Sequence, residues 1–138
     1  MSAFCIRTFD GRPDTFAESP DHLANLLELS SKQYDGHPTL VNIYDGDDRI
    51  SVIGLGASFS TLQCVDKRRG ISSRVIADIP RSDDLTFSYQ SQATHISPKY
   101  LIDVQTAIRV AVTWLSQDQL SSDVKWISHD YRGPRKAS

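Results

Sequence analysis

The side chains best suited to acid–base or nucleophilic chemistry in this sequence are four histidines and two cysteines, and they are widely separated. A nucleophile needs a base within hydrogen-bond reach, and a zinc site needs three or four clustered ligands. His22, His37 and His129 stand in three different segments, and neither cysteine has a partner at metal-ligand spacing. His95, at the end of an expected strand near the strand of Cys64, is the best single candidate. We therefore expect no catalytic residue, no metal and no cofactor.

Short sequence motifs add little to this picture. The G-x-S-x-G elbow, the H-E-x-x-H pair and the phosphate-binding P-loop do not occur. Gly54-Leu55-Gly56 resembles the start of a dinucleotide fingerprint, but Phe59 occupies the position of the third glycine. Two glycines on one face of a strand instead indicate a bulge or the close approach of another segment. Cys5 and Cys64 are expected to be buried, reduced thiols.

The acidic residues are more informative, because aspartate outnumbers glutamate heavily. Two glutamates among 17 acidic residues leave 15 aspartates, a residue that favours turns and helix caps. Two aspartate clusters in expected turns raise the local negative potential and would attract a basic partner, with plain turn chemistry as the alternative. Their members are Asp45, Asp47, Asp48, Asp83 and Asp84. The opposing cluster Lys67-Arg68-Arg69 is expected to be a solvated loop.

Length and composition restrict the class of protein. The chain has 138 residues, 39% of them hydrophobic and 23% charged, which fits a globular domain rather than a disordered or fibrous chain. A net charge of -2 argues against a dedicated nucleic-acid surface. No apolar run approaches the roughly 20 residues that cross a bilayer, and the first residues do not resemble a signal peptide. We expect a cytoplasmic protein with one domain over residues 1–130 and a disordered basic tail at 131–138.

The first third of the chain predicts one strand and one helix. Alternation over residues 3–9 indicates a strand. Ser19-Pro20-Asp21 is typical of a helix start, because serine caps free amides and proline tolerates the first helical turn. Leu23, Leu26 and Leu27 give the helix one apolar face, and the helix should end near Asp35-Gly36.

The remaining elements predict an α+β fold. Strands are expected at 40–44, 50–57, 60–65, 72–76, 85–90 and 124–127. Because short turns join most of them, they should form an antiparallel meander of about six to seven strands, with two helices packed on it. The second helix is expected to begin at Ser97-Pro98-Lys99 and to continue to Leu115 with a wide apolar stripe. The place of strand 3–9 in the sheet is left open.

With these elements in order, the sequence resembles the first-numbered immunity protein family of bacterial polymorphic toxin systems. The resemblance covers roughly residues 40–127 and rests mainly on hydrophobic patterns. The segments that carry it are Ile50-Ser51-Val52-Ile53-Gly54-Leu55-Gly56, Leu62-Gln63-Cys64, Phe87-Ser88-Tyr89, the helix over 104–115 with Ala107 and Ala111, and Val124-Lys125-Trp126. The chain departs from the family where a glycine often follows the Phe-x-Tyr strand, since Gln90-Ser91 stands there. It also departs where an acidic residue should precede the long helix, since His95-Ile96-Ser97 stands there.

The resemblance implies inhibition by binding, with no chemistry of the protein's own. The partner would be a cognate toxin domain, typically a nuclease or a nucleic-acid deaminase, and no nucleic acid or membrane would be bound directly. The oligomeric state is left open, with a monomer favoured. Because such enzymes present cationic groups to nucleic acid, an acidic inhibitor surface is physically sensible.

These observations give the candidate toxin contacts. The five clustered aspartates, Asp45, Asp47, Asp48, Asp83 and Asp84, would set the association rate, and Tyr44 or Phe59 would serve as aromatic anchors. One alternative is a small ligand-binding or enzymatic domain with a site near His95 and Cys64. Another is a structural subunit of a larger assembly, which would expose an apolar surface patch.

Overall fold

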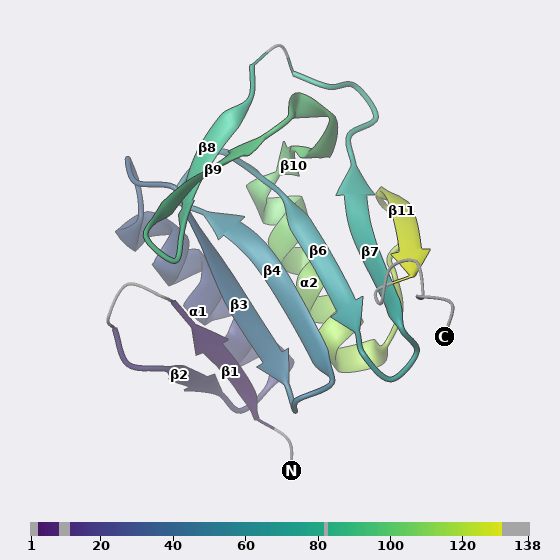
Figure 1. The fold of residues 1–138 in the computed structure, drawn as a ribbon. Coiled ribbons are helices and arrows are strands. Elements are labelled where there is room, and N and C mark those ends of the chain that lie inside the picture. Colours follow the sequence, from purple (N-terminus) through teal and green to yellow (C-terminus); the bar gives the residue numbers. More distant parts are fainter. Residues whose placement is uncertain (1–2, 9–11, 82, 131–138) are drawn as a thin grey trace, which may run out of the picture.

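The structure, a computed structural model, describes residues 3–8, 12–81 and 83–130 as an antiparallel sheet with two helices on one face (Figure 1). The helices are α1 (Pro20–Gln33) and α2 (Val104–Gln117). The strands are β1 (Phe4–Arg7), β2 (Thr15–Ala17), β3 (Thr39–Asp45), β4 (Arg49–Leu55), β5 (Phe59–Ser60), β6 (Leu62–Asp66), β7 (Ile71–Ile76), β8 (Leu85–Tyr89), β9 (Gln92–Ile96), β10 (Ile102–Asp103) and β11 (Lys125–Asp130). The predicted α+β class is confirmed. The tail predicted at 131–138 lies outside the described residues.

The sheet is built on the predicted meander. Strands β3, β4, β6 and β7 follow one another as antiparallel neighbours. The N-terminal strand β1 pairs antiparallel with β3, which settles the placement that the sequence left open. On its outer side β1 pairs with the short strand β2, which the sequence analysis missed. The last strand β11 pairs with β7 at the opposite edge, so the order is β11-β7-β6-β4-β3-β1-β2.

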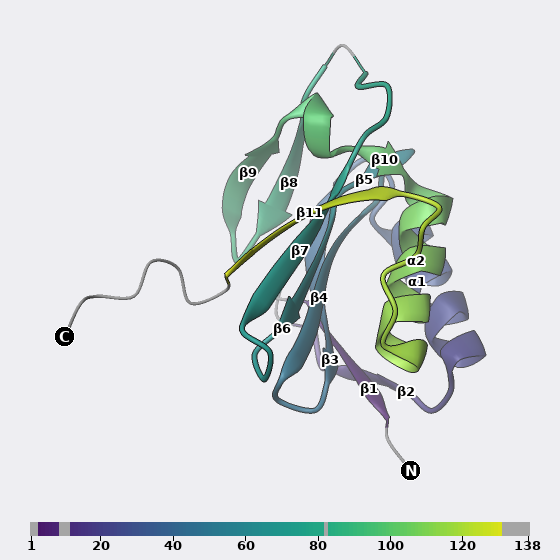
Figure 2. The same ribbon diagram turned by 90° about the vertical axis from the view of Figure 1, so that its right-hand side faces the viewer.

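The strand expected at 85–90 does not extend the meander. Instead β8 forms a hairpin with β9 and touches the sheet through one parallel pairing, Thr39 with Ser88. Figure 2 shows this hairpin on the face of the sheet opposite the two helices. The tight turn of the hairpin places Gln90 and Ser91 at φ 51° and 65°, a left-handed conformation that glycine adopts most easily.

The first helix is confirmed with its predicted caps. The Ser19 hydroxyl accepts a hydrogen bond from the His22 amide, and the helix ends at Gln33 just before Gly36, whose φ is +84°. Leu23 and Leu27 are fully buried against the sheet. Local signals therefore suffice to define this helix.

The second helix begins later than predicted, at Val104 rather than at Ser97. Ser97-Pro98-Lys99 starts only a single 3-10 turn over Pro98–Tyr100, because Ile102 and Asp103 then become extended and pair with β5. The helix is capped by Asp103, whose carboxylate accepts a hydrogen bond from the Thr106 amide at 3.1 Å. An acidic residue thus directly precedes the long helix at Asp103, and His95-Ile96-Ser97 lies further upstream because the helix begins later than predicted.

Hydrophobic cores lie on both faces of the sheet, and two glycines allow close packing. The larger core lies between the sheet and the helices, and a smaller one around Phe87 lies beneath the β8–β9 hairpin. A side chain on Gly54 would meet the Phe87 ring, and one on Gly56, at φ +100°, would meet the backbone of Tyr34. The prediction that these glycines mark close approaches is confirmed.

Candidate functional site

The five candidate aspartates do not form one surface. Asp45, Asp47 and Asp48 lie in or beside the turn between β3 and β4, whereas Asp83 and Asp84 lie in the loop between β7 and β8. These two segments stand at opposite ends of the sheet in Figure 1. We call them the hairpin end (Tyr44, Asp45, Asp47 and Asp48) and the loop end (Phe59, Asp83 and Asp84). Phe59 belongs with the latter because Arg81, from the same loop, lies 4.6 Å over its ring.

At the hairpin end, two of the three carboxylates are occupied by internal ion pairs. Asp45 contacts Arg49 at 2.8 Å, and Asp48 contacts Arg68 at 3.2 Å. Asp47 is exposed and has no ion pair within the described part of the chain. Pairing reduces the negative potential that these side chains project into solvent, so the cluster is less acidic than its sequence suggests.

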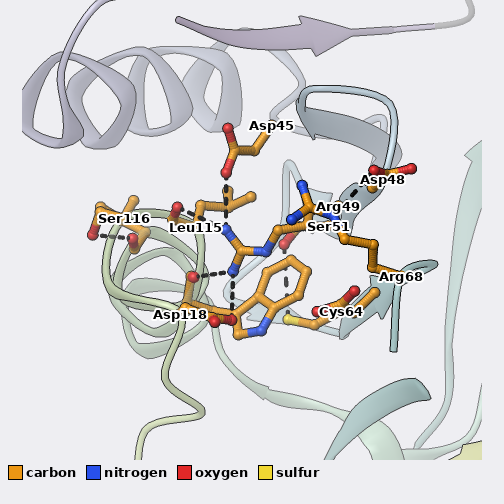
Figure 3. Close-up of polar contacts among 12 residues, drawn as sticks. Asp45, Asp48, Arg49, Ser51, Cys64, Arg68, Leu115, Ser116 and Asp118 are labelled. Atoms are coloured by element: carbon orange, nitrogen blue, oxygen red, sulfur yellow. Dashed lines mark hydrogen bonds and ion pairs between the residues drawn. The ribbon is translucent and has the colours of Figure 1, made fainter. Parts of the chain in front are cut away.

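Arg49 is the centre of this network and ties the hairpin end to the second helix (Figure 3). Its guanidinium donates to the carbonyl oxygens of Trp114 at 2.6 Å and Leu115 at 3.2 Å, and it contacts Asp118 at 3.2 Å. It also stacks 4.3 Å over the Trp114 ring. Because the last carbonyls of a helix lack partners within the helix, a cation there satisfies them and favours the negative end of the helix dipole. Sequence reasoning missed this role of Arg49.

Asp118 caps the same end of α2 and is shared between two arginines. It adopts a left-handed conformation, φ 57°, and its carboxylate accepts hydrogen bonds from Arg69 at 2.6 and 3.0 Å. These bonds are the main reason why the pKa of Asp118 is lowered, and Arg49 lowers it further. The stability that this carboxylate contributes is present above its ordinary pKa and is lost as pH falls through the lowered value.

The aromatic candidates are held differently from one another. Tyr44 is half-buried on the sheet face opposite the helices, where its hydroxyl accepts a hydrogen bond from Asn42 at 3.1 Å and Arg7 lies over its ring. Phe59 is half-buried at the loop end. Asp83 and Asp84 are exposed there, and neither forms an ion pair with a described residue. The loop end therefore combines an aromatic ring with two unpaired carboxylates and one arginine, Arg81.

The structure does not bring His95 and Cys64 together. Cys64 is 2% exposed in the core beneath the helices, with its sulfur 3.7 Å from the Ser51 hydroxyl oxygen. His95 is exposed on the β8–β9 hairpin, on the other face, and bonds to the Thr86 hydroxyl at 2.7 Å. Among the described residues, no three histidine, cysteine, aspartate or glutamate side chains are grouped so that they could hold a metal ion. The prediction of two buried thiols is correct for Cys64 but not for Cys5, which is only half-buried.

Cys64 is expected to resist thiol reagents in the folded protein. Burial raises the pKa of its thiol to about 12, so almost no reactive thiolate is present at neutral pH. A C5S variant should therefore show no fast reaction with Ellman's reagent until urea unfolds it, whereas a C64S variant should react through the more accessible Cys5. Rapid modification of native C5S would contradict this account and would favour a reactive site at Cys64.

Comparison with protein-family models gives a match over most of the chain. The family model described as immunity protein Imm1 matches residues 12–128, which is most of the chain and includes both helices. No curated protein matches the sequence. Within the described residues, neither helix is long and apolar enough to span a membrane.

Proposed function

The chain belongs to the Imm1 family of immunity proteins, and on this premise we propose that it neutralises one cognate bacterial toxin domain by binding it and blocking its active site. The proposed toxin is a nuclease or a nucleic-acid deaminase, met in the cytoplasm. The inhibitor would act by binding alone, and the proposed binding unit is a single domain over residues 1–130. The family match is the observation that carries this proposal.

The loop end is the stronger candidate for electrostatic attraction of the toxin. A toxin that grips nucleic acid presents cationic groups, and unpaired carboxylates attract such a surface more effectively than carboxylates already bound to arginine. Asp83 and Asp84 form no ion pair with any described residue, whereas Asp45 and Asp48 do. Phe59 would provide the apolar contact beside them. At the hairpin end, Asp47 forms no ion pair with a described arginine, so it is the acidic candidate contact there. Tyr44 is the aromatic candidate at the same end.

Removing the two loop-end charges should slow association with the toxin. At low salt, a D83N/D84N variant is expected to bind about fivefold more slowly than the natural chain, with a weaker salt dependence and unchanged folding. An E28Q/D35N variant is the matched control, because it also removes two negative charges, but from exposed positions on or just after α1. Stopped-flow association kinetics would measure both. Equal slowing in the two variants would indicate a net-charge effect and contradict the loop-end assignment.

Protection of growing cells tests the function itself. Expression of the cognate toxin domain alone should arrest growth, and co-expression of this chain should restore it. A toxin with its active site disabled provides the control for expression burden. Growth arrest that persists with the chain present at equal or higher abundance would contradict the proposed function.

A further inference from the structure

A cleft on the sheet face opposite the helices has the chemistry of a small binding site. It has a volume of about 240 Å³ and lies between the sheet and the β8–β9 hairpin, the two elements that stand apart in Figure 2. Its walls include the apolar side chains of Leu40, Val52 and Ile96. The rest of the lining carries polar groups, and Arg74 on β7 is its charged member. The other four are Thr61, Gln63, Tyr89 and Thr94. None of these residues belongs to the proposed toxin contacts.

Arg74 brings an uncompensated positive charge into this cleft. Its side chain is half-buried, and burial lowers its pKa from the ordinary arginine value. The guanidinium lies 4.0 Å over the Tyr100 ring, but it has no ion pair or hydrogen bond with any described residue. Arg49 and Arg109, by contrast, each contact an aspartate. A half-buried guanidinium without an anion is an unfavourable arrangement that a bound carboxylate would correct.

Thr61 also lines the cleft and carries an unsatisfied polar atom. The residue is 4% exposed, and its hydroxyl oxygen is buried without a hydrogen-bond partner among the described residues. Its backbone carbonyl is occupied, because it accepts hydrogen bonds from the Gly54 amide and the Ser60 hydroxyl. Buried hydroxyls are normally paired, so this enclosed oxygen, which has almost no surface open to the cleft, is an unsatisfied group in the wall and not a contact that a ligand already reaches.

We infer that this cleft binds a small organic carboxylate with a compact apolar body. Arg74 would pair with the carboxylate, and Leu40, Val52 and Ile96 would contact the hydrocarbon part. A phosphate ester fits less well, because it carries up to two negative charges and Arg74 is the one cationic side chain among the described residues that line the cleft. An ammonium compound would be repelled by Arg74. None of the proposed toxin contacts lines this cleft, and neither does His95 or Cys64, although the neighbours of His95, Thr94 and Ile96, do.

Nuclear magnetic resonance titration with 4-methylpentanoate tests the inference on the intact chain. We expect saturable shifts at the Arg74 Nε–H group and at the methyl groups of Thr61, Val52 and Ile96, with a dissociation constant on the order of 1 mM for so small a ligand. The neutral isostere 4-methylpentanamide should bind at least about tenfold more weakly, because it loses the charge-assisted hydrogen bond. This comparison needs no variant, so it does not depend on how a substitution affects folding.

Two variants identify the residue responsible. R74Q should reduce the affinity for 4-methylpentanoate by about tenfold or more and remove its advantage over the amide. R81Q is the matched control, because Arg81 also contacts an aromatic ring and has no ion pair with a described residue, yet it does not line the cleft. R81Q should bind like the natural chain. Equal affinities for acid and amide, or the absence of shifts in the cleft at saturating probe, would overturn the inference.

Discussion

Replacing Arg49 by methionine is expected to lower the free energy of unfolding by about 3 kcal/mol, although the residue lies beside an exposed turn. Its side chain is only 14% exposed, and it holds Asp45 and the last carbonyls of α2 at the same time. Methionine keeps much of the packing against Trp114 but cannot donate a hydrogen bond. The variant therefore leaves the partly buried Asp45 carboxylate and the Leu115 carbonyl without this donor, whereas the Trp114 carbonyl keeps its bond from the Asp118 amide.

Urea denaturation measures this loss, and the chain contains a matched control. Arg109 also contacts an aspartate, Asp123, at 3.2 Å, but both side chains are 60% exposed. An exposed pair of this kind contributes little, so R109M should cost less than about 1 kcal/mol. The midpoint should shift while the denaturant slope stays constant. Similar losses in R49M and R109M would contradict the structural role assigned to Arg49.

Replacing Gly54 by alanine should cost about 2 kcal/mol and loosen the β8–β9 hairpin. The added Cβ would meet the ring of Phe87, which is fully buried and has little room to move. The hairpin is joined to the sheet by this ring, by the buried Ile96 beside it, by the pairing of Thr39 with Ser88, and by the hydrogen bond from the Tyr89 hydroxyl to Asn42. Faster amide hydrogen exchange in β8 and β9 than in β4 would accompany the loss of stability.

A second substitution should rescue the first. Phe87→Leu removes the ring atoms that the new Cβ would meet, so G54A/F87L should be little less stable than F87L alone. The two changes are then non-additive, with a coupling energy of about 1 kcal/mol or more. If the two losses of stability simply add, the cost of alanine at position 54 does not come from a clash with Phe87, and the account of this packing is wrong.

Cap and turn residues in the sequence predicted the parts of this fold that depend only on residues close together in the chain. The serine cap and the glycine stop define α1, and short turns define the meander from β3 to β7. The start of α2 was misplaced because Ser97-Pro98 can open either a helix or a single turn. What decides between them is the pairing of β10 with β5, a contact across more than 40 residues. The position of the β8–β9 hairpin likewise depends on Phe87 packing on Gly54.

The candidate site shows the same division. Sequence reasoning found the aspartate clusters but could not show that they lie at opposite ends of the sheet. Pairing of Asp45 with Arg49 is local, yet the contacts of Arg49 with the carbonyls of α2 join residues about 65 positions apart. No spacing rule relates such residues. The sequence therefore could not predict which carboxylates are left without an internal ion pair, because that depends on contacts made only in the folded chain.

Calorimetric titration of this chain against the proposed cognate toxin domain, with the toxin's activity assayed on the same mixtures, tests the central claim most directly. Our account predicts binding at a fixed stoichiometry with nanomolar or tighter affinity, and a loss of toxin activity that is complete at the equivalence point. Absence of binding at micromolar concentrations, or full activity in the saturated complex, would contradict it.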